Sequence, residues 1–281
     1  MSLAASYAHC EAQLRAEDHD AWLAALFAPA EARPHLHAIG AFVLEVGHVR
    51  RRVRQPIAGE IRLQWWQDVV DGERAAEAAA QPVAAALLDT MVGAALPVAP
   101  VGDMLDAFRM GLHDEPPADL PALERRLIAT HGTPVRLAAR VLGGGPAVDP
   151  AADDAGVALG IAALLDDFGH RDPGHRVPLP AELLQRHGSH QGEVDLAEAT
   201  PALRSVLAEL HDCARARLSA LRHRRADLGP AGPAFITTAL VEPRLDLDVE
   251  RLSAPSGSPR DLSPLRRQWR MWRAARKGGV L

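Results

Sequence analysis

Apolar residues recur along most of the chain at the spacing of an amphipathic α-helix. Between residues 33 and 53, Leu36, Ile39, Val43 and Val46 lie three or four positions apart and therefore fall on one face of a helix. Regular alternation of apolar and polar residues, the pattern of a half-buried strand, is almost missing. Ala, Leu, Arg and Glu are abundant, and all four are strong helix formers. The pattern predicts an all-α protein.

Prolines and glycines divide this pattern into separate helices, because both residue types end or break a helix. Helices are expected at about 33–53, 56–72, 82–95, 98–114, 119–142, 150–168, 201–227, 231–244 and 263–276. Residues 169–200 lack the helical period and predict a loop with at most a short helix near 180–187. Without internal repeats, the chain is expected to form one domain of about nine to eleven helices, residues 1–259, with residues 260–281 as a separate tail.

Composition excludes several classes of protein. The chain has 281 residues and a formal net charge of −5, which disfavours binding to nucleic acid. No apolar run reaches the roughly 18–20 residues that span a bilayer, and no signal peptide is recognisable, so a cytoplasmic protein is expected. Cys10 and Cys213 are too isolated to predict a zinc site or a disulfide framework. Thirty of the 31 basic residues are arginine, which suggests a GC-rich bacterial genome.

The charge is unevenly distributed. Residues 260–281 contain seven basic residues and one acidic residue, a net charge of +6, so the rest of the chain carries −11. This segment predicts an amphipathic helix with an apolar face of Leu262, Leu265, Trp269 and Trp272. Basic residues that include Arg270 and Arg273 lie beside that face. Two interpretations remain open: the helix docks its tryptophan face on the acidic body, or it contacts the inner membrane peripherally.

Two adjacent tryptophans, Trp65 and Trp66, stand out in the segment IRLQWWQDVV at 61–70. On a helix they point about 100° apart, so one can face the core and the other a neighbouring helix. This arrangement predicts a packing centre with solvated polar neighbours. The alternative is that Arg62, Gln64 and Asp68 of the same segment line a cavity.

Acidic side chains also gather at two helices further along the chain. Asp166 and Asp167 fall at the end of a helix, where negative charge opposes the helix dipole, so an arginine or a cation should compensate them. The following loop, rich in His and Asp, is either solvated or a metal site. Asp103, Asp106 and Arg109 are spaced by three residues and predict ion pairing along one helix face, with Arg109 as a further candidate for a cavity wall.

The order of these segments resembles the squalene/phytoene synthase family. Residues 38–53 and 61–70 resemble its first core helices, and in its second motif Asp167 aligns with the first Asp, Arg176 with the loop Arg, and Leu179-Pro180 with the Leu-Pro. The resemblance covers most of the chain. It implies an isoprenoid-synthase-type helical bundle around a central cavity, where Asp-rich motifs hold Mg²⁺ ions that bind a prenyl diphosphate and neutralise its charge as it leaves.

The chain departs from the acidic motifs that this chemistry requires. Where the first Asp-rich motif belongs, positions 47–51 read Gly-His-Val-Arg-Arg, and Glu45 is the only acid nearby. In the second motif the next ligand position holds Arg171, and the upstream positions that carry Gln and Asn in synthases hold Gly160 and Ala163.

These departures favour a family member without synthase activity, similar to the branch that contains a mitochondrial complex I assembly factor. It would need no cofactor and would bind an isoprenoid or lipid-like ligand, or a subunit of a membrane complex. The alternative is a Mg²⁺-dependent prenyltransferase that condenses prenyl diphosphates, with Asp167 and Arg176 as catalytic residues on metal and phosphate. The cavity-lining candidates are Glu45, Arg62, Gln64, Asp68, Arg109 and Asp166, and the candidate metal ligands are Asp167, Asp68 and Asp71.

Overall fold

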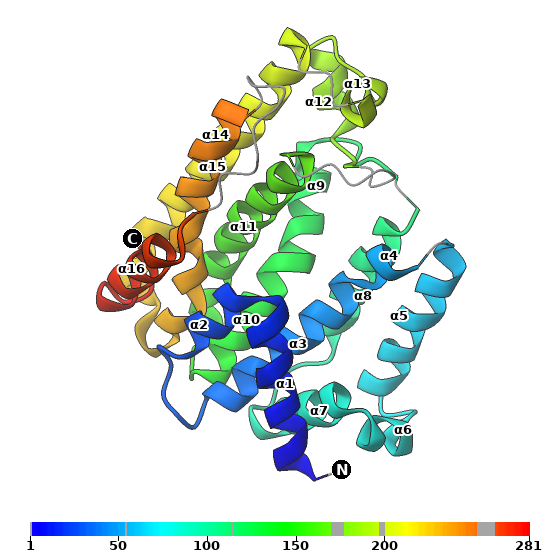
Figure 1. Cartoon of the computed structure of the whole chain (residues 1–281), viewed down its shortest axis with the longest axis vertical. Coiled ribbons are helices and arrows are strands. Elements are labelled where there is room, and N and C mark those ends of the chain that lie inside the picture. The colour runs from blue at the N-terminus through cyan, green and yellow to red at the C-terminus, as the bar shows by residue number, and fades with distance from the viewer. Residues whose placement is uncertain (1, 54, 114, 170–176, 197–199, 252–261) are drawn as a thin grey trace.

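Helices make up the regular structure of the residues that can be described (Figure 1). The computed structural model describes residues 2–53, 55–113, 115–169, 177–196, 200–251 and 262–281, and these residues form no β-strand. The prediction of an all-α protein is therefore confirmed. None of the described helices is long and apolar enough to cross a membrane.

The first part of the chain forms a group of helices joined by short turns. Their bounds are α1 (Leu3–Glu17), α2 (His19–Ala25), α3 (Arg33–Gly47), α4 (Val49–Arg52), α5 (Pro56–Val70), α6 (Ala75–Ala80), α7 (Pro82–Gly93) and α8 (Ala99–Gly111). The remainder consists of α9 (Leu120–Leu127), η1 (Ile128–Gly132), α10 (Thr133–Val141), η2 (Pro146–Val148), α11 (Asp149–Gly169), α12 (Ala181–Arg186), α13 (Gln191–Leu196), α14 (Pro201–His223), η3 (Arg225–Asp227), η4 (Gly229–Leu240), α15 (Val241–Arg251) and α16 (Pro264–Arg276).

Each predicted helix is present, but several are divided. The helix expected over 33–53 ends at Gly47, and the single turn of α4 follows it. The helix expected over 119–142 contains one π-helical turn, η1, between α9 and α10. Much of the helix expected over 231–244 is the 3₁₀ helix η4; Pro233 inside it has no N–H to donate to a helical hydrogen bond.

Two N-terminal helices, α1 and α2, were not predicted, and the described residues contain more helices than the nine to eleven expected. The reason is visible in α1, whose buried residues are Ser6, Cys10 and Leu14. They share one face at a spacing of four, but only Leu14 is strongly apolar, so the sequence shows no clear hydrophobic period. The loop predicted over 169–200 holds two short helices, α12 and α13, of which only the first was expected.

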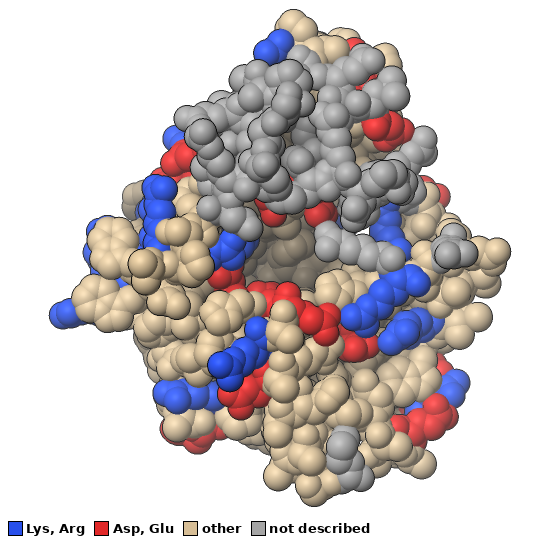
Figure 2. Space-filling view, viewed as in Figure 1, with Lys and Arg blue, Asp and Glu red and all other residues tan. Residues whose placement is uncertain are grey.

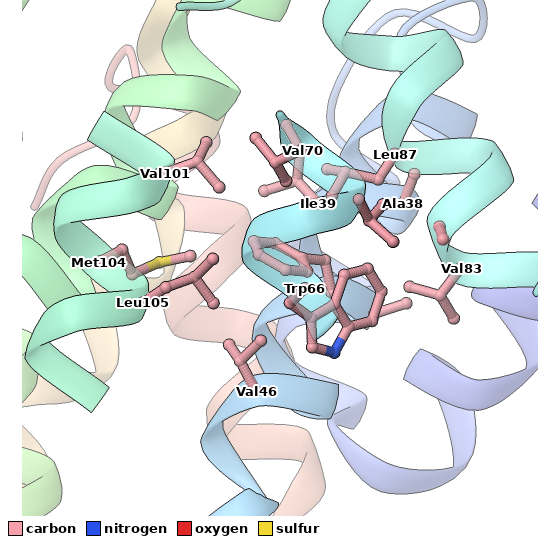
Figure 3. Close-up of a cluster of buried hydrophobic side chains, with 14 of the residues drawn as sticks. Ala38, Ile39, Val46, Trp66, Val70, Val83, Leu87, Val101, Met104 and Leu105 are labelled. Carbon is pink, nitrogen blue, oxygen red and sulfur yellow. The ribbon is translucent and has the colours of Figure 1, made fainter. Parts of the chain in front are cut away.

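The first hydrophobic core lies between α3, α5, α7 and α8 (Figure 3). Trp66 is almost fully buried there, with its ring centroid 4.9 Å from that of Phe42. Trp65 is half-buried, packs edge-on against Trp66 and donates its indole N–H to Glu77 over 2.9 Å. The tryptophan pair is therefore the packing centre that the sequence predicted, with one ring in the core and one against a neighbouring helix.

The second core surrounds α11, which packs against α14, α15 and η1. The approach of α11 to η1 depends on glycine: a Cβ atom on Gly156 would lie 2.4 Å from the backbone nitrogen of Gly132. One turn later, a Cβ atom on Gly160 would lie 2.6 Å from the side chain of Leu127. These contacts hold η1 alongside α11, and so fix His131 of η1 relative to the acidic end of α11.

The C-terminal helix α16 packs on η4 and α2, but not through the face that was predicted. Its buried residues are Met271 and Ala274, whereas Trp269 and Trp272 are 53% and 46% exposed. Leu262, expected on the tryptophan face, precedes the helix and is buried with Met271 in the contact with η4. The docking of the tryptophan face on the body of the protein is therefore a wrong prediction, although the helix itself docks.

Candidate functional site

Glu45, the acid nearest to the first motif, is enclosed by positively charged and amide donors. It projects from α3, and its side chain is only 13% exposed. Gln13 Nε2 donates to Glu45 Oε1 over 3.1 Å, and Arg62 Nη2 of α5 donates to Glu45 Oε2 over 3.2 Å. Arg52 Nη1 lies 3.8 Å from Oε1. Both carboxylate oxygens of Glu45 therefore already have side-chain partners. These partners balance the negative charge that would otherwise attract a metal ion.

The turn that follows Glu45 is strongly basic. Arg52 of α4 donates to Glu17 over 3.2 Å, and the charge of Arg50 in the same turn acts on Arg126 of α9. Burial, together with the charge of Arg50, lowers the pKa of Arg126. The side chain of Arg51 lies outside the described part of the chain. Arg50 and Arg52 therefore place positive charge in this turn, and the reversal of sign relative to an acidic metal-binding motif stays a prediction.

A second polar cluster extends along α5 toward α8. Asp68 accepts from Gln64 Nε2 over 2.7 Å and from Arg74 Nε over 2.8 Å, and these hydrogen bonds lower its pKa. Gln64 also accepts from Arg109 Nη2 of α8 over 3.4 Å. Three of the predicted cavity-lining residues, Gln64, Asp68 and Arg109, therefore form one hydrogen-bonded chain, while Glu45 and Arg62 form another pair.

The other predicted polar contacts lie at the edges of this cluster. Arg109 forms the expected ion pair with Asp106 along α8. Asp71, at the end of α5, is exposed and accepts from Gln67 Nε2 over 2.9 Å.

At the end of α11, Asp166 and Asp167 are half-buried, and Asp167 acts electrostatically on His131 of η1. Burial lowers the pKa of His131 to about 4, and the negative charge of Asp167 opposes part of that shift. The sequence reasoning did not select His131. The signal for it is a π-helical turn, which is common at functional sites but cannot be read from a single sequence. Arg171 and Arg176 lie outside the described residues.

Three of the candidate carboxylates do not offer the free oxygen ligands that a magnesium ion needs. Mg²⁺ takes about six oxygen ligands, several of them carboxylates or phosphates. Glu45, Asp68 and Asp71 all accept hydrogen bonds from nearby side chains instead. No group of three His, Cys, Asp or Glu side chains in the part of the chain that the structure describes, which leaves out 170–176, is placed to hold a metal ion. At Gly160 and Ala163 the helix offers no side-chain ligand either.

Figure 2 shows a hollow in the middle of the face viewed, with acidic side chains at its rim and basic side chains to one side. Side chains of both signs of charge therefore lie around this hollow.

The family model for squalene/phytoene synthase matches residues 14–273, which is nearly the whole chain. The chain belongs to the squalene/phytoene synthase family. NADH dehydrogenase (ubiquinone) complex I, assembly factor 6 of Mus musculus is 27% identical over 252 residues, which cover 87% of this chain and 76% of that protein. Phytoene synthase of Thermus thermophilus is 35% identical over 124 residues, covering 43% of this chain and 42% of the enzyme.

The fold is that of the squalene/phytoene synthase family as well. The crystal structure of a dehydrosqualene synthase in complex with ligand superposes on this chain with a TM-score of 0.83, covering 97% of this chain and 96% of the other, at 16% sequence identity. The family's helical architecture is therefore retained. Within it, Glu45 and Asp68 are paired with Arg62 and Arg74.

His131 of η1 is expected to give the stability of the protein a measurable pH dependence. Its folded-state pKa of about 4 lies below the ordinary value of about 6.5, so the unfolded chain takes up the proton first. Neutral His131 therefore makes its full contribution to the free energy of unfolding above about pH 6.5. This contribution is lost as the pH falls toward 4. In His131→Asn, the free energy of unfolding measured by urea titration should fall less over this interval than in the wild-type chain. Equal falls would show that His131 does not titrate in this way.

Proposed function

We propose that this chain is a non-catalytic member of the family that binds an isoprenoid or other lipid-like ligand and takes part in assembling a respiratory membrane complex. The observation that carries the proposal is the state of Glu45, which is held by Arg62 and Gln13 rather than facing other carboxylates. The similarity to complex I assembly factor 6 over 87% of the chain supports the choice of a membrane-complex subunit as partner.

A prenyl diphosphate ionises only if the growing negative charge on the diphosphate is neutralised in place. Synthases use magnesium ions for this purpose, and those ions need carboxylates that are not already paired. Here Glu45 and Asp68 are bonded to Arg62 and Arg74. We infer that the protein works without Mg²⁺ or another cofactor.

Incubation with Mg²⁺ and farnesyl or geranylgeranyl diphosphate tests the absence of catalysis. We expect no release of pyrophosphate above that of a protein-free control, while a phytoene synthase assayed in parallel releases it readily. Pyrophosphate release by the wild-type chain that disappears in Asp167→Ala would overturn the proposal.

That result would establish the second candidate function, a prenyltransferase that condenses prenyl diphosphates. Asp167 is the observation that favours this function, because it aligns with an acid of the second motif and lies at the end of α11 with His131 nearby. Arg176 would then be the residue that contacts phosphate.

The assembly role has its own test, which does not depend on the ligand. Deleting the gene from its host should lower the amount of assembled respiratory complex in isolated membranes. The wild-type chain and Asp167→Ala should both restore it, because a scaffold needs no catalytic carboxylate. Restoration by the wild-type chain alone would indicate that the acid has a chemical role.

We also infer that the protein is cytoplasmic and contacts the inner membrane peripherally through α16. The support is the exposure of Leu265, Trp269 and Trp272, which are 78%, 53% and 46% exposed on one helix that also carries several arginines. Tryptophan and arginine together are typical of helices that lie in the membrane interface.

A further inference from the structure

The exposed apolar residues of α16 lie on the side of the helix that faces away from the protein. At about 100° per residue, Leu265, Trp269 and Trp272 fall within about 60° of one another, on the opposite side from Ala274 and Met271. The body of the protein holds that opposite side: Arg267 Nη1 donates to the buried Asp20 of α2 over 2.8 Å. The helix is thus fixed in orientation. The ring contacts of its apolar face come from arginines of the same helix, with Arg273 over Trp269 and Arg276 over Trp272.

A basic pocket lies beside this face, where α14, η3, α15 and α16 meet. Its volume is about 490 Å³, and it is lined by Arg222, Arg225, Glu242, Arg270, Arg273, Lys277 and Leu281. The pocket therefore gathers five cationic side chains around one acidic side chain, and it includes Lys277, the single lysine of the chain. The left edge of Figure 2, where Figure 1 draws α16, shows basic side chains beside uncharged ones.

Internal contacts neutralise only part of this charge. Glu242 accepts from Arg222 over 3.1 Å and lies 3.6 Å from Arg270, and Arg222 Nε also donates to the main-chain oxygen of Leu281 over 2.6 Å. Arg225, Arg273 and Lys277 form no ion pair with any carboxylate of the described chain. Burial lowers the pKa of Arg270; the charge of Glu242 opposes this shift, and the nearby charges of Arg266 and Arg273 add to it. The pocket has an excess of positive charge that an anion would balance.

Arg273 joins the pocket to the apolar face. Its guanidinium lies over the ring of Trp269, 4.6 Å from the centroid, while the same side chain lines the pocket. A ligand in the pocket therefore sits next to whatever surface receives the tryptophans. Guanidinium groups bind phosphate through two parallel hydrogen bonds, which makes a phosphate the anion that best suits an arginine-rich pocket.

We propose that this pocket binds the headgroup phosphate of an anionic phospholipid while Leu265, Trp269 and Trp272 enter the membrane interface. The inference rests on the proposed membrane contact and names its ligand. A bilayer is the occupant that fits, because it alone offers an apolar layer beneath a dense layer of phosphates. A nucleic acid would leave the three large apolar side chains without a partner.

Vesicle flotation with the full chain tests the proposal. The first vesicle contains about one part phosphatidylglycerol to three parts phosphatidylcholine. In the second vesicle, oleate replaces phosphatidylglycerol at an equal negative charge, so that the anionic group is a carboxylate and not a phosphate. The pocket variant is Arg225→Gln/Lys277→Gln. The matched control is Arg125→Gln/Arg204→Gln, which removes two exposed arginines of α9 and α14 away from the pocket. The face variant is Trp269→Ser/Trp272→Ser.

The wild-type chain should bind phosphatidylglycerol vesicles more tightly than oleate vesicles. Each basic residue near an anionic surface contributes about a fivefold effect, so the pocket variant should bind phosphatidylglycerol about thirtyfold more weakly and lose its preference for phosphate. The control should change by less than about threefold. Thermal unfolding of each variant shows whether it is folded, and the exposed positions chosen should leave it so.

Other outcomes would overturn either the phosphate pocket alone or the membrane contact as well. If the pocket variant weakens binding no more than the control, or if the wild-type chain prefers neither vesicle, the phosphate pocket is wrong. If the face variant abolishes binding in that case, the peripheral contact still stands. If the wild-type chain binds neither vesicle, both the contact and the pocket are wrong.

Discussion

Replacing Trp66 with alanine is expected to lower the free energy of unfolding by about 3–5 kcal/mol, the usual cost of removing a large aromatic side chain from a core. Trp66 is 1% exposed and packs against Phe42, so the variant leaves a cavity between α3, α5, α7 and α8 that the surrounding helices cannot close fully. Urea unfolding followed by circular dichroism measures the change.

The chain provides a matched control in the adjacent tryptophan. Trp65 is half-buried and makes one hydrogen bond, to Glu77, so Trp65→Ala should cost only about 1–2 kcal/mol. Equal losses in the two variants would show that Trp66 is not the centre of this core. If Trp66→Ala does not fold at all, Trp66→Phe, which keeps most of the apolar surface, gives a smaller loss that can be measured.

Local patterns predicted the fold because each depends on residues that are close in sequence. The helical period, the prolines at helix starts and the Asp106–Arg109 pair all involve spacings of one turn. Trp66 faces the core and Trp65 a neighbouring helix because successive residues of a helix are rotated by about 100°. Because these features are set by local helix geometry, they could be predicted from the sequence, and the structure confirms them.

The candidate site depends on residues that are distant in sequence, and here the sequence left alternatives open. Glu45 and Arg62 are 17 residues apart, and their contact decides whether Glu45 is available to a metal ion. The sequence shows that both charges exist but not that they meet. The same applies to His131 and Asp167, which come together because glycine allows η1 to approach α11.

The error at α16 has a specific physical cause. The helix has a conspicuous face of Trp and Leu and a modest face of Met271 and Ala274, and a hydrophobic pattern ranks the first above the second. Packing instead selects the face with small and flexible side chains, because η4 approaches it closely; at Gly232, a Cβ atom would lie 2.5 Å from the backbone of Gly278 just after the helix. Bulky indole rings would not fit at that distance.

Replacing Arg217 with methionine is expected to cost about 3–5 kcal/mol, because it leaves two poorly solvated carboxylates without their main partner. Arg217 of α14 donates to Glu124 of α9 over 2.7 Å and to Asp154 of α11 over 3.2 Å. The side chains of Glu124 and Asp154 are only 19% and 6% exposed. Arg224 still donates to Asp154 over 3.2 Å, so the largest loss falls on Glu124.

Two variants separate the effect of charge from that of packing. Arg215, two residues away on α14, pairs with the exposed Asp246, so Arg215→Met should cost less than about 1 kcal/mol. Adding Glu124→Gln to Arg217→Met should restore at least about 1 kcal/mol, since the amide removes the uncompensated negative charge while keeping the shape of the side chain. Chemical denaturation of the three variants measures each change. If the double variant is no more stable than Arg217→Met, the loss comes from packing of the arginine stem, and the three helices are not held together by charge.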